Sequence, residues 1–334
     1  MTLRIGINGF GRIGRCIVRQ AFHQAFNHIE IVHINDLVSL PTCAHLLQYD
    51  SVHGVWNNTV SSVAGGMRIN DKTISVSSIR SPAEIPWGEK GVDIVLECSG
   101  IFTKGPEAEA HLKAGAQKVL ISAPATDIDL TVVYGVNEKS LRREHRIVSN
   151  GSCTTNCLAP VAKVVHEHFG INNALMTTIH SYTNDQQVLD LAHKDLRRAR
   201  AAALNMIPTS TGAAQAIGLV LPELQGKFDG IAVRVPTPNV SLVDVSFNLV
   251  RPTSLDAVNA CLKSAAEGNL RGIMAYSEAP LVSGDFNGTS YSSIIDAPMT
   301  KMMGDRFLKV LAWYDNETGF SNRMLDIASL MGTI

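Results

Sequence analysis

A cysteine at position 153 and a histidine at position 180 form the pair of residues best suited to covalent chemistry in this chain. Cys153 follows the turn-forming pair Asn150-Gly151 and stands at the predicted start of a helix. His180 ends a β-rich run 27 positions later. A helix N-terminus and an imidazole both favour the thiolate, which is the nucleophilic form of cysteine. The residue types alone also permit a buried structural cysteine near an ordinary helix cap.

A glycine-rich segment, residues 8–14, follows the first predicted strand and opens the first predicted helix. Its G-x-G-x-x-G spacing in this context is typical of a dinucleotide site. Gly9 permits the tight turn, Gly11 lets the backbone approach a pyrophosphate, and Gly14 lets the helix pack closely on the strand. Asp36 ends the second predicted strand, 22 residues after Gly14. We expect it to bind both ribose hydroxyls of NAD and to repel the extra phosphate of NADP. The alternative is a glycine-rich turn beside a solvated acid.

The elements that must position these residues differ between the two halves of the chain. The first half alternates strands with helices, which predicts an α/β fold with a Rossmann-type doubly wound parallel sheet. Its expected strands are 3–8, 30–36, 92–99 and 118–122, and its expected helices are 11–25 and 106–114. The second half has longer strands and predicts a second α+β catalytic domain with a mixed or antiparallel sheet. Its expected strands are 174–180, 230–235, 241–251 and 307–314, and its expected helices are 213–221 and 323–330.

This change of pattern gives the expected domain boundaries. We expect a dinucleotide-binding domain over 1–152 and a catalytic and substrate domain over 153–316. A C-terminal helix at about 317–334 is expected to pack back on the first domain.

Composition excludes several functional classes. The chain has 334 residues and 45% hydrophobic content, enough for two ordinary cores. A net charge of −1 provides no basic field for nucleic acid or an anionic membrane. No apolar stretch approaches the ~20 residues of a membrane span, and the N-terminus lacks a signal-peptide pattern. Six cysteines are too sparse for a disulfide framework, and Cys153 and Cys157 lack the C-x-x-C spacing of a zinc or redox pair. We therefore expect a cytoplasmic protein with no metal site, no membrane contact and no nucleic acid as its primary partner.

Six segments in order resemble one enzyme family. Residues 152–160, Ser-Cys-Thr-Thr-Asn-Cys-Leu-Ala-Pro, are similar to the active-site signature of the phosphorylating glyceraldehyde-3-phosphate dehydrogenases. Further similar segments are 8–15, 49–54, 180–183, 234–239 and 313–317. The similarity covers essentially the whole chain. It implies a homotetrameric NAD-dependent enzyme that oxidises and phosphorylates D-glyceraldehyde 3-phosphate to 1,3-bisphosphoglycerate, in glycolysis or gluconeogenesis.

The resemblance implies a role for each member of the Cys–His pair. Cys153 would attack the aldehyde as a thiolate and give a hemithioacetal. His180 would lower the pKa of the thiol by forming an ion pair, and would take the hydroxyl proton as hydride leaves for the nicotinamide. Inorganic phosphate would then release the acyl group from the thioester. The backbone N–H of Cys153 is a plausible donor to the developing oxyanion.

The resemblance also implies two phosphate sites and further cofactor contacts. The substrate C3 phosphate would bind Thr183 and Arg234, and the attacking phosphate would bind Ser152, Thr154, Arg198, Thr211 and Gly212. Asp185 would orient a neighbouring arginine, and Cys157 would be a small packed side chain. The expected NAD contacts, besides the three glycines, are Arg12, Ile13, Asp36, Arg80, Ser122, Asn184 and Asn316. Arg80 and Ser122 rest on the resemblance alone, and Asn316 would bind the nicotinamide carboxamide.

Two alternative functions remain open at this point. Residues 142–150 look more like the sister erythrose-4-phosphate dehydrogenases, whose reaction ends in hydrolysis. The loop 182–185, in contrast, is similar to the glyceraldehyde-3-phosphate branch, and it is the segment expected to contact substrate. The second alternative is a catalytically idle NAD-binding interaction protein, and the intact set of Cys153, His180 and Arg234 argues against it.

Overall fold

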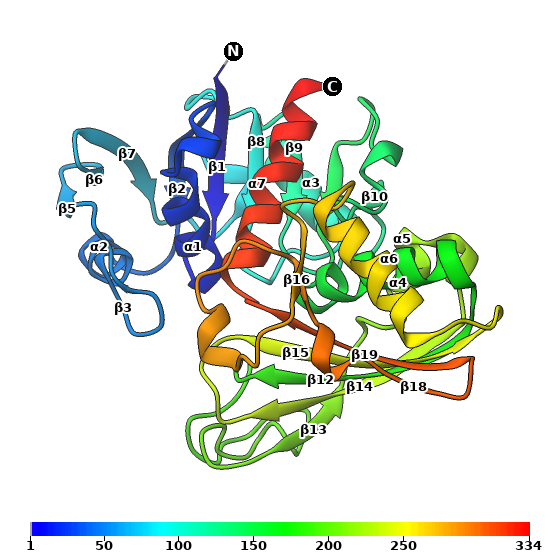
Figure 1. Cartoon of the computed structure of the whole chain (residues 1–334). Coiled ribbons are helices and arrows are strands. Elements are labelled where there is room, and N and C mark those ends of the chain that lie inside the picture. The colour runs from blue at the N-terminus through cyan, green and yellow to red at the C-terminus, as the bar shows by residue number, and fades with distance from the viewer. Residues whose placement is uncertain (1) are drawn as a thin grey trace. The chain divides into compact units, whose positions relative to one another are not determined.

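The structure is a computed structural model that describes residues 2–334, and its contacts divide the chain into two compact units (Figure 1). The first unit contains the chain up to Val132 together with Glu138–Gly151 and Ser321–Ile334. The second unit contains Val133–Asn137 and Ser152–Phe320. Each unit has its own sheet, and each is described by itself.

The first unit is built on a mostly parallel sheet of nine strands. Their order is β10-β11-β9-β8-β1-β2-β7-β6-β5. The bounds are β1 Leu3–Asn8, β2 Ile29–Asn35, β5 Val60–Val63, β6 Gly66–Ile69, β7 Lys72–Ser77, β8 Ile94–Glu97, β9 Lys118–Ile121, β10 Leu130–Thr131 and β11 Ile147–Ser149. Only the pairs β5–β6 and β6–β7 are antiparallel within this sheet of described residues. The short strands β3 Tyr49–Asp50 and β4 Gly54–Val55 pair separately.

The strand order of the first unit creates a ligand-binding edge. The chain runs outward from β1 through β2, then returns to place β8 on the other side of β1. Ligands of doubly wound sheets bind at the carboxyl ends of the strands at this point of reversal. All four residues of β8 are buried, which fits a strand covered on both faces. The predicted parallel sheet is therefore confirmed.

The helices of the first unit connect these strands. They are α1 Arg12–Ala21, α2 Leu40–Gln48 and α3 Gly105–Lys113, with short 3₁₀ turns η1 Gln24–Phe26, η2 Pro82–Glu84 and η3 Glu138–Ser140. The predicted helix 11–25 was too long, because the chain turns after Ala21 and buries Phe26 in the core. The antiparallel strands β5 and β6, and helix α2, were not predicted.

The second unit is built on a mixed sheet. Its strand order is β13-β14-β12-β15-β19-β17-β16, and β18 pairs with β19. The bounds are β12 Ile171–Ser181, β13 Ile207–Ser210, β14 Phe228–Val235, β15 Ser241–Leu249, β16 Met274–Ser277, β17 Ser293–Asp296, β18 Lys301–Met303 and β19 Phe307–Tyr314. The pairs β12–β14 and β16–β17 are parallel, and β15 runs antiparallel to both of its neighbours. The prediction of a mixed sheet is confirmed.

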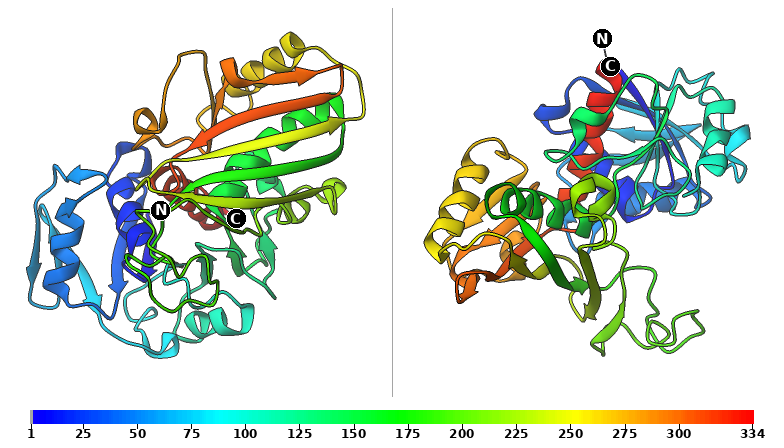
Figure 2. Two further views of the ribbon diagram at one scale, coloured as in Figure 1. Left: turned by 90° about the horizontal axis from the view of Figure 1, so that it is seen from below. Right: turned by 90° about the vertical axis from the view of Figure 1, so that its right-hand side faces the viewer.

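Helices cover one face of this second sheet. The unit also has the 3₁₀ turns η4 Pro222–Leu224, η5 Ser283–Phe286 and η6 Ala297–Met299, and Phe286 of η5 stacks on Trp313 in a separate core cluster. The helices on the covered face are α4 Cys153–Phe169, α5 Ile217–Val220 and α6 Leu255–Glu267. Figure 2 shows these helices on one side of the long strands, where the apolar core of the unit lies. The predicted helix 213–221 was wrong over most of its length. Only the four residues Ile217–Val220 are helical, and Pro222 follows shortly after them.

The last helix, α7 Thr318–Thr333, is longer than the predicted 323–330. Its first turn is held by Asp315, whose Oδ1 accepts from the backbone N–H of Glu317 and of Thr318. Its C-terminal part packs in the first unit, where Lys118 Nζ donates to the Met331 carbonyl at 2.7 Å.

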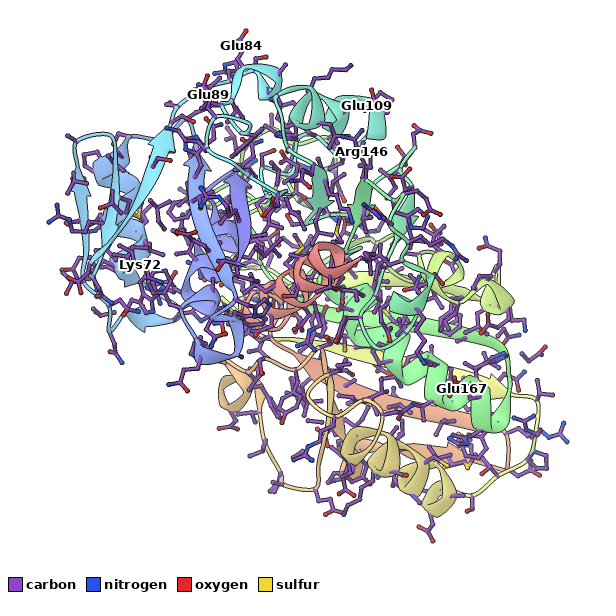
Figure 3. All side chains as sticks on the ribbon, turned by 90° about the horizontal axis from the view of Figure 1, so that it is seen from above. Lys72, Glu84, Glu89, Glu109, Arg146 and Glu167 are labelled. Carbon is purple, nitrogen blue, oxygen red and sulfur yellow. The ribbon has the colours of Figure 1, made fainter. Side chains whose placement is uncertain are left out.

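Many charged side chains lie on the outside of the fold. Glu84, Glu89, Glu109, Arg146 and Glu167 are exposed, and Figure 3 shows them projecting from the ribbon. Within residues 2–334, no helix combines the length and the apolar character needed to cross a membrane.

Candidate active site

Cys153 is the first residue of helix α4, as the sequence predicts. Ser152 caps this helix, because its Oγ accepts from the backbone N–H of Thr155 at 3.0 Å. Gly151 precedes it with φ of 63°, a left-handed conformation that glycine adopts without strain. The helix continues through Pro160 to Phe169. This arrangement places the Cys153 sulfur at the positive end of the helix dipole.

His180 lies beside Cys153, from the adjacent strand β12. Its Nε2 is 3.6 Å from the Cys153 Sγ. Its Nδ1 is 2.7 Å from the Ser181 carbonyl oxygen, which can only accept a hydrogen bond. The Nδ1 atom therefore carries the proton, and Nε2 is left as the acceptor that faces the thiol.

Arg234 lies opposite His180 on the neighbouring parallel strand β14. Its Nη1 donates to the Ser181 carbonyl at 3.1 Å and to Thr183 Oγ1 at 3.2 Å. The same nitrogen is 3.1 Å from His180 Nδ1. One guanidinium thus joins the predicted substrate-phosphate residue Thr183 to the backbone that holds the histidine.

Burial acts against a charge on either member of the pair. It raises the pKa of the Cys153 thiol, although the positive charge of Arg234 acts in the opposite direction. Burial, reinforced by the Arg234 charge, lowers the pKa of His180 to about 3. The ion pair predicted from the sequence therefore depends on the mutual attraction of the two groups. Transfer of the shared proton from Sγ to Nε2 leaves the net charge of the pair unchanged.

The predicted attacking-phosphate residues are found in two groups. Ser152 and Thr154 flank Cys153, but the Thr154 hydroxyl is turned inward to the Tyr314 hydroxyl at 2.8 Å. Thr211 is half-buried, and a Cβ added at Gly212 would meet no atom within 4 Å, so this backbone is open to a ligand. Arg198 donates to Thr209 Oγ1 and is paired with Asp185.

Further side chains around these groups form ion pairs or are packed in the core. Asp185, which is expected to orient a neighbouring arginine, forms an ion pair with Arg198. Arg200 pairs with Asp190, and Arg197 is exposed. Cys157 is fully buried, as predicted for a packed side chain, with Sγ 3.6 Å from Ser293 Oγ.

The glycine-rich turn of the first unit borders a hollow of about 360 Å³. Its lining includes Gly9, Gly11, Asp36 and Arg80. Asp36 follows β2 and accepts from the backbone N–H of Phe10 at 2.5 Å and of Val38 at 2.8 Å. This hollow lies at the carboxyl ends of the strands, where a dinucleotide would be expected.

The glycines of this turn fit a dinucleotide. A Cβ on Gly9 would lie 2.5 Å from the Ser99 nitrogen, and one on Gly14 would lie 2.3 Å from the Gly9 oxygen. A Cβ on Gly11 would meet nothing within 4 Å, so its backbone is open to a bound phosphate group. Arg12 and Ile13 form the first turn of α1 beside it, and Arg12 is paired with Asp50 at 2.6 Å.

The remaining expected cofactor residues are distributed over both units. Ser122 follows β9 in the first unit, and its backbone N–H donates to the Glu97 carbonyl. Asn184 and Asn316 belong to the second unit. Asn184 is exposed, whereas Asn316 is fixed by Ser181 Oγ and Ser241 Oγ, which both donate to its Oδ1 at 2.8 Å.

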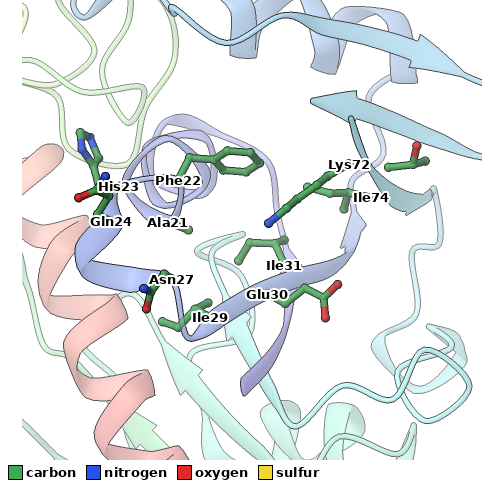
Figure 4. Close-up of a pocket in the computed structure, with 11 residues that line it drawn as sticks. Ala21, Phe22, His23, Gln24, Asn27, Ile29, Glu30, Ile31, Lys72 and Ile74 are labelled. Carbon is green, nitrogen blue, oxygen red and sulfur yellow. The ribbon is translucent and has the colours of Figure 1, made fainter. Parts of the chain in front are cut away.

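A second hollow of about 250 Å³ lies elsewhere on the first unit (Figure 4). Its lining comes from residues 21–31 and 72–74. None of the predicted site residues is among them, so this hollow is separate from the dinucleotide pocket.

Comparison with known proteins identifies the family. A family model described as "Glyceraldehyde 3-phosphate dehydrogenase, NAD binding domain" matches residues 3–105, and one described as "Glyceraldehyde 3-phosphate dehydrogenase, C-terminal domain" matches residues 152–316. The glyceraldehyde-3-phosphate dehydrogenase 1 of Bacillus subtilis is 57% identical over 98% of both chains. The glyceraldehyde-3-phosphate dehydrogenase of Geobacillus stearothermophilus is 56% identical over 100% of this chain and 99% of its own.

The chain belongs to the glyceraldehyde 3-phosphate dehydrogenase family.

The structure adds one residue to the site of this dehydrogenase that the sequence did not single out. Tyr314, at the end of β19, is buried, and its hydroxyl is 2.8 Å from both Thr154 Oγ1 and Thr178 Oγ1. Its ring lies edge-to-face against the His180 ring, with centroids 6.0 Å apart. The only signal in the sequence was the position of Tyr314 within the family-like segment 313–317.

Proposed function

We propose that this chain is the NAD-dependent phosphorylating glyceraldehyde-3-phosphate dehydrogenase of a cytoplasmic glycolytic or gluconeogenic pathway. It would convert D-glyceraldehyde 3-phosphate, NAD and inorganic phosphate into 1,3-bisphosphoglycerate and NADH. The observation that carries the proposal is the 3.6 Å approach of Cys153 Sγ to His180 Nε2, while the other ring nitrogen, Nδ1, lies 2.7 Å from the Ser181 carbonyl oxygen. Free thiols at all six cysteines are consistent with a reducing compartment.

The first step forms a bond between Cys153 and the substrate aldehyde. The thiol proton passes to His180 Nε2 while Sγ attacks the aldehyde carbon. Negative charge then develops on the carbonyl oxygen, and the Cys153 N–H at the start of α4 can donate to it. His180 returns the proton to that oxygen, which gives a neutral hemithioacetal.

The second step oxidises this hemithioacetal to a thioester. NAD, when bound, supplies the acceptor for the hydride that leaves the carbon. His180 Nε2 takes the hydroxyl proton at the same time, so that a C=O bond replaces the C–O–H group. The Ser181 carbonyl stabilises the resulting imidazolium through the Nδ1–H group.

The third step transfers the acyl group to inorganic phosphate. A phosphate oxygen attacks the thioester carbon, the C–S bond breaks, and the Cys153 thiolate leaves and regains the proton from His180. We propose Ser152, Thr154, Arg198, Thr211 and Gly212 as the groups that hold the attacking phosphate. Because the Thr154 hydroxyl is turned inward to Tyr314, we propose that Thr154 contacts the phosphate through its backbone N–H.

Substrate orientation is assigned to Arg234 and Thr183. A guanidinium and a hydroxyl together can bind a phosphate through charge-assisted hydrogen bonds. The Arg234 Nε atom is buried without a hydrogen-bond partner, which supports a ligand contact at this group. A bound phosphate would also offset the Arg234 charge that opposes an imidazolium at His180.

We further propose residues up to about 152 as the dinucleotide-binding domain and 153–316 as the catalytic domain, with the helix after 317 belonging structurally to the first. The proposed cofactor contacts are Gly9, Gly11, Arg12, Ile13, Gly14, Asp36, Arg80, Ser122, Asn184 and Asn316. The open backbone at Gly11 and the lining of the pocket support the assignments in the first unit. The fixed Oδ1 of Asn316 leaves its NH₂ group as the donor to the nicotinamide carboxamide.

The assembly is proposed to be a homotetramer of this chain. Large apolar side chains are exposed in the segment after the catalytic histidine, namely Val188, Leu189, Leu191, Leu196, Leu204 and Met206. Large apolar side chains that are exposed together in one segment of a chain are often covered in a subunit interface.

An NADH-absorbance assay with glyceraldehyde 3-phosphate tests the proposal. We expect turnover that requires inorganic phosphate and prefers NAD to NADP. The Cys153→Ser variant should lose nearly all oxidation while it keeps its affinity for NAD, and Cys157→Ser is the control. Turnover of erythrose 4-phosphate that is independent of phosphate would instead support the sister enzyme.

A further inference from the structure

Glu97 is a buried acid that none of the steps above uses. It is the last residue of β8, and only 1% of its surface is exposed. Strand β8 lies next to β1 at the point of reversal in the sheet, and Glu97 is paired in register with Asn8. A buried carboxyl at this edge needs hydrogen-bond donors to compensate for lost hydration.

Four donors surround the Glu97 carboxylate. Oε2 accepts from Asn8 Nδ2 at 2.6 Å and from His111 Nε2 at 2.9 Å. Oε1 accepts from the Ser99 backbone N–H at 2.7 Å and from Ser99 Oγ at 2.5 Å. Asn8 Nδ2 and the Ser99 N–H can only donate, and each of them bonds to a different oxygen of the carboxylate.

His111 and Trp87 hold Glu97 from the side of helix α3. The indole N–H of Trp87 donates to His111 Nδ1 at 3.0 Å. Because the indole nitrogen is a donor only, His111 Nδ1 is unprotonated and Nε2 carries the proton given to Glu97. Both rings are fully buried, so water cannot replace either of these hydrogen bonds when one partner is removed.

The same chain of bonds continues across the floor of the dinucleotide pocket. Asn35 Nδ2 donates to Asn8 Oδ1 at 2.9 Å, and Ser77 Oγ donates to Asn35 Oδ1 at 2.7 Å. His33 Nε2 lies 2.8 Å from Ser77 Oγ. The carboxyl ends of β8, β1, β2 and β7 are therefore joined by side chains as well as by their backbones.

This network touches the pocket directly. Asn8, Asn35 and Ser99 all line it. The Ser99 nitrogen that Glu97 holds is also the atom that a Cβ on Gly9 would approach to 2.5 Å. The position of Ser99 thus sets the distance between the loop that follows β8 and the glycine-rich turn at Gly9.

We propose that Glu97 is a positioning residue for the cofactor. It fixes Asn8 and Ser99, and through them the spacing between the glycine turn and the β8 loop; His111 and Trp87 fix Glu97 in turn. The proposal rests on the proposed function, because it assigns NAD to this pocket. A glutamine at position 97 would place an NH₂ group against groups that can only donate, so at least one contact to Asn8, Ser99 or His111 would be lost.

The test compares Glu97→Gln with Asp93→Asn by calorimetric titration of NAD. Asp93 lies just before the opposite end of β8, and its carboxylate likewise accepts from a backbone N–H, that of Arg4, and from an amide, that of Gln117. We expect Glu97→Gln to raise the Kd for NAD about tenfold, and Asp93→Asn to leave it within about twofold of the parent value. In steady state, Glu97→Gln should raise KM for NAD and leave kcat at saturating NAD nearly unchanged.

A second pair of variants separates positioning from loss of fold. His111→Gln keeps an N–H donor for Glu97, whereas His111→Phe removes it and keeps a ring. We expect weaker NAD binding for His111→Phe and near-parent binding for His111→Gln. Equal affinities in this pair, an unchanged Kd for Glu97→Gln, or an equal loss in Asp93→Asn would each overturn the inference. Failure of the parent protein to bind NAD would instead overturn the proposed function.

Discussion

At the scale of single residues, the site depends on which atom holds one proton. His180 Nδ1–H is committed to the Ser181 carbonyl, so Nε2 is the acceptor available to the Cys153 thiol. Burial raises the pKa of Cys153 and lowers that of His180, so neither group ionises easily without the other. The reactivity of the sulfur should therefore depend on His180 more than on exposure.

Replacing His180 by Asn tests this dependence through the pH profile of Cys153 alkylation. Without its proton acceptor, the thiol keeps the raised pKa that burial gives it, and the thiolate fraction at neutral pH falls. We expect iodoacetamide labelling at pH 7 to slow by about tenfold or more, since one pKa unit corresponds to a factor of ten. The labelling rate should recover only as pH rises toward the thiol pKa. His166→Asn, at a histidine in the last turn of helix α4, is the control. An unshifted profile for His180→Asn would contradict the account.

A second residue-scale prediction concerns Asp36 and the choice of cofactor. Asp36→Ala removes the acceptor proposed for the ribose hydroxyls. Asp36→Asn removes the charge and leaves one acceptor oxygen in place of the two that accept from the Phe10 and Val38 N–H groups. We expect Asp36→Ala to weaken NAD binding about tenfold or more. Both variants should lower the preference for NAD over NADP, measured as the ratio of kcat/KM values. A retained preference in both would show that another residue excludes NADP.

Site residues could be predicted from the sequence where a short, uncommon motif marks them. A cysteine at a helix start and a glycine-rich turn after a strand each have a short-range signature, and Cys153 and Gly9 were identified from it. Tyr314 and Glu97 carry no such signature. They become informative only because Thr178 and His111, far away in the sequence, are their partners.

At the scale of elements, Tyr314 connects strand β19 to helix α4, which carries Cys153, and to strand β12, which carries His180. Its hydroxyl bonds Thr154 of α4 and Thr178 of β12, and Tyr314 itself ends β19. Thr154 follows Cys153, and Thr178 lies two residues before His180 on the same strand. The 3.6 Å distance between sulfur and imidazole is therefore supported by a buried bridge between helix and sheet.

Tyr314→Phe should weaken this bridge without changing the ring. It would leave the buried Thr154 and Thr178 hydroxyls without their shared partner, so we expect the free energy of unfolding to fall by about 1–3 kcal/mol. The rate of Cys153 alkylation should fall as well, because the helix start and β12 lose their common anchor. Tyr276→Phe, at a half-buried tyrosine of the same unit, is the control for the loss of a hydroxyl. Parent-like unfolding and alkylation would show that the bridge is not needed.

Elements were predictable where one pattern ran uninterrupted. The strand Phe307–Tyr314 agrees with its prediction in full, since a run of mostly apolar and aromatic residues continues along it without a glycine or proline. The segment 213–221 has an apolar helical pattern but forms mostly turns and is helical only over Ile217–Val220, with Pro222 shortly after. The pairing of His180 with Arg234 across β12 and β14 could not be predicted, because strand register is a long-range property.

At the scale of the whole molecule, apolar exposure is concentrated after the catalytic histidine. Leu196 is 82% exposed and Leu204 is 77% exposed in a single chain. Leaving several such side chains in water is unfavourable, at roughly 25 cal/mol for each Å² of apolar surface. Another copy of the chain is the partner we propose for this surface.

Replacing Leu196 by Asp should destabilise the proposed homotetramer, because a carboxylate would have to be buried unpaired in the interface. We expect light scattering behind size-exclusion chromatography to give four times the chain mass for the parent and a smaller species for the variant at low concentration. Val55→Asp, at an exposed apolar residue of the first unit, is the matched control and should keep the parent mass. A single-chain mass for the parent at micromolar concentration would overturn the proposed assembly. Retained tetramer in Leu196→Asp would instead show that the interface lies on another face.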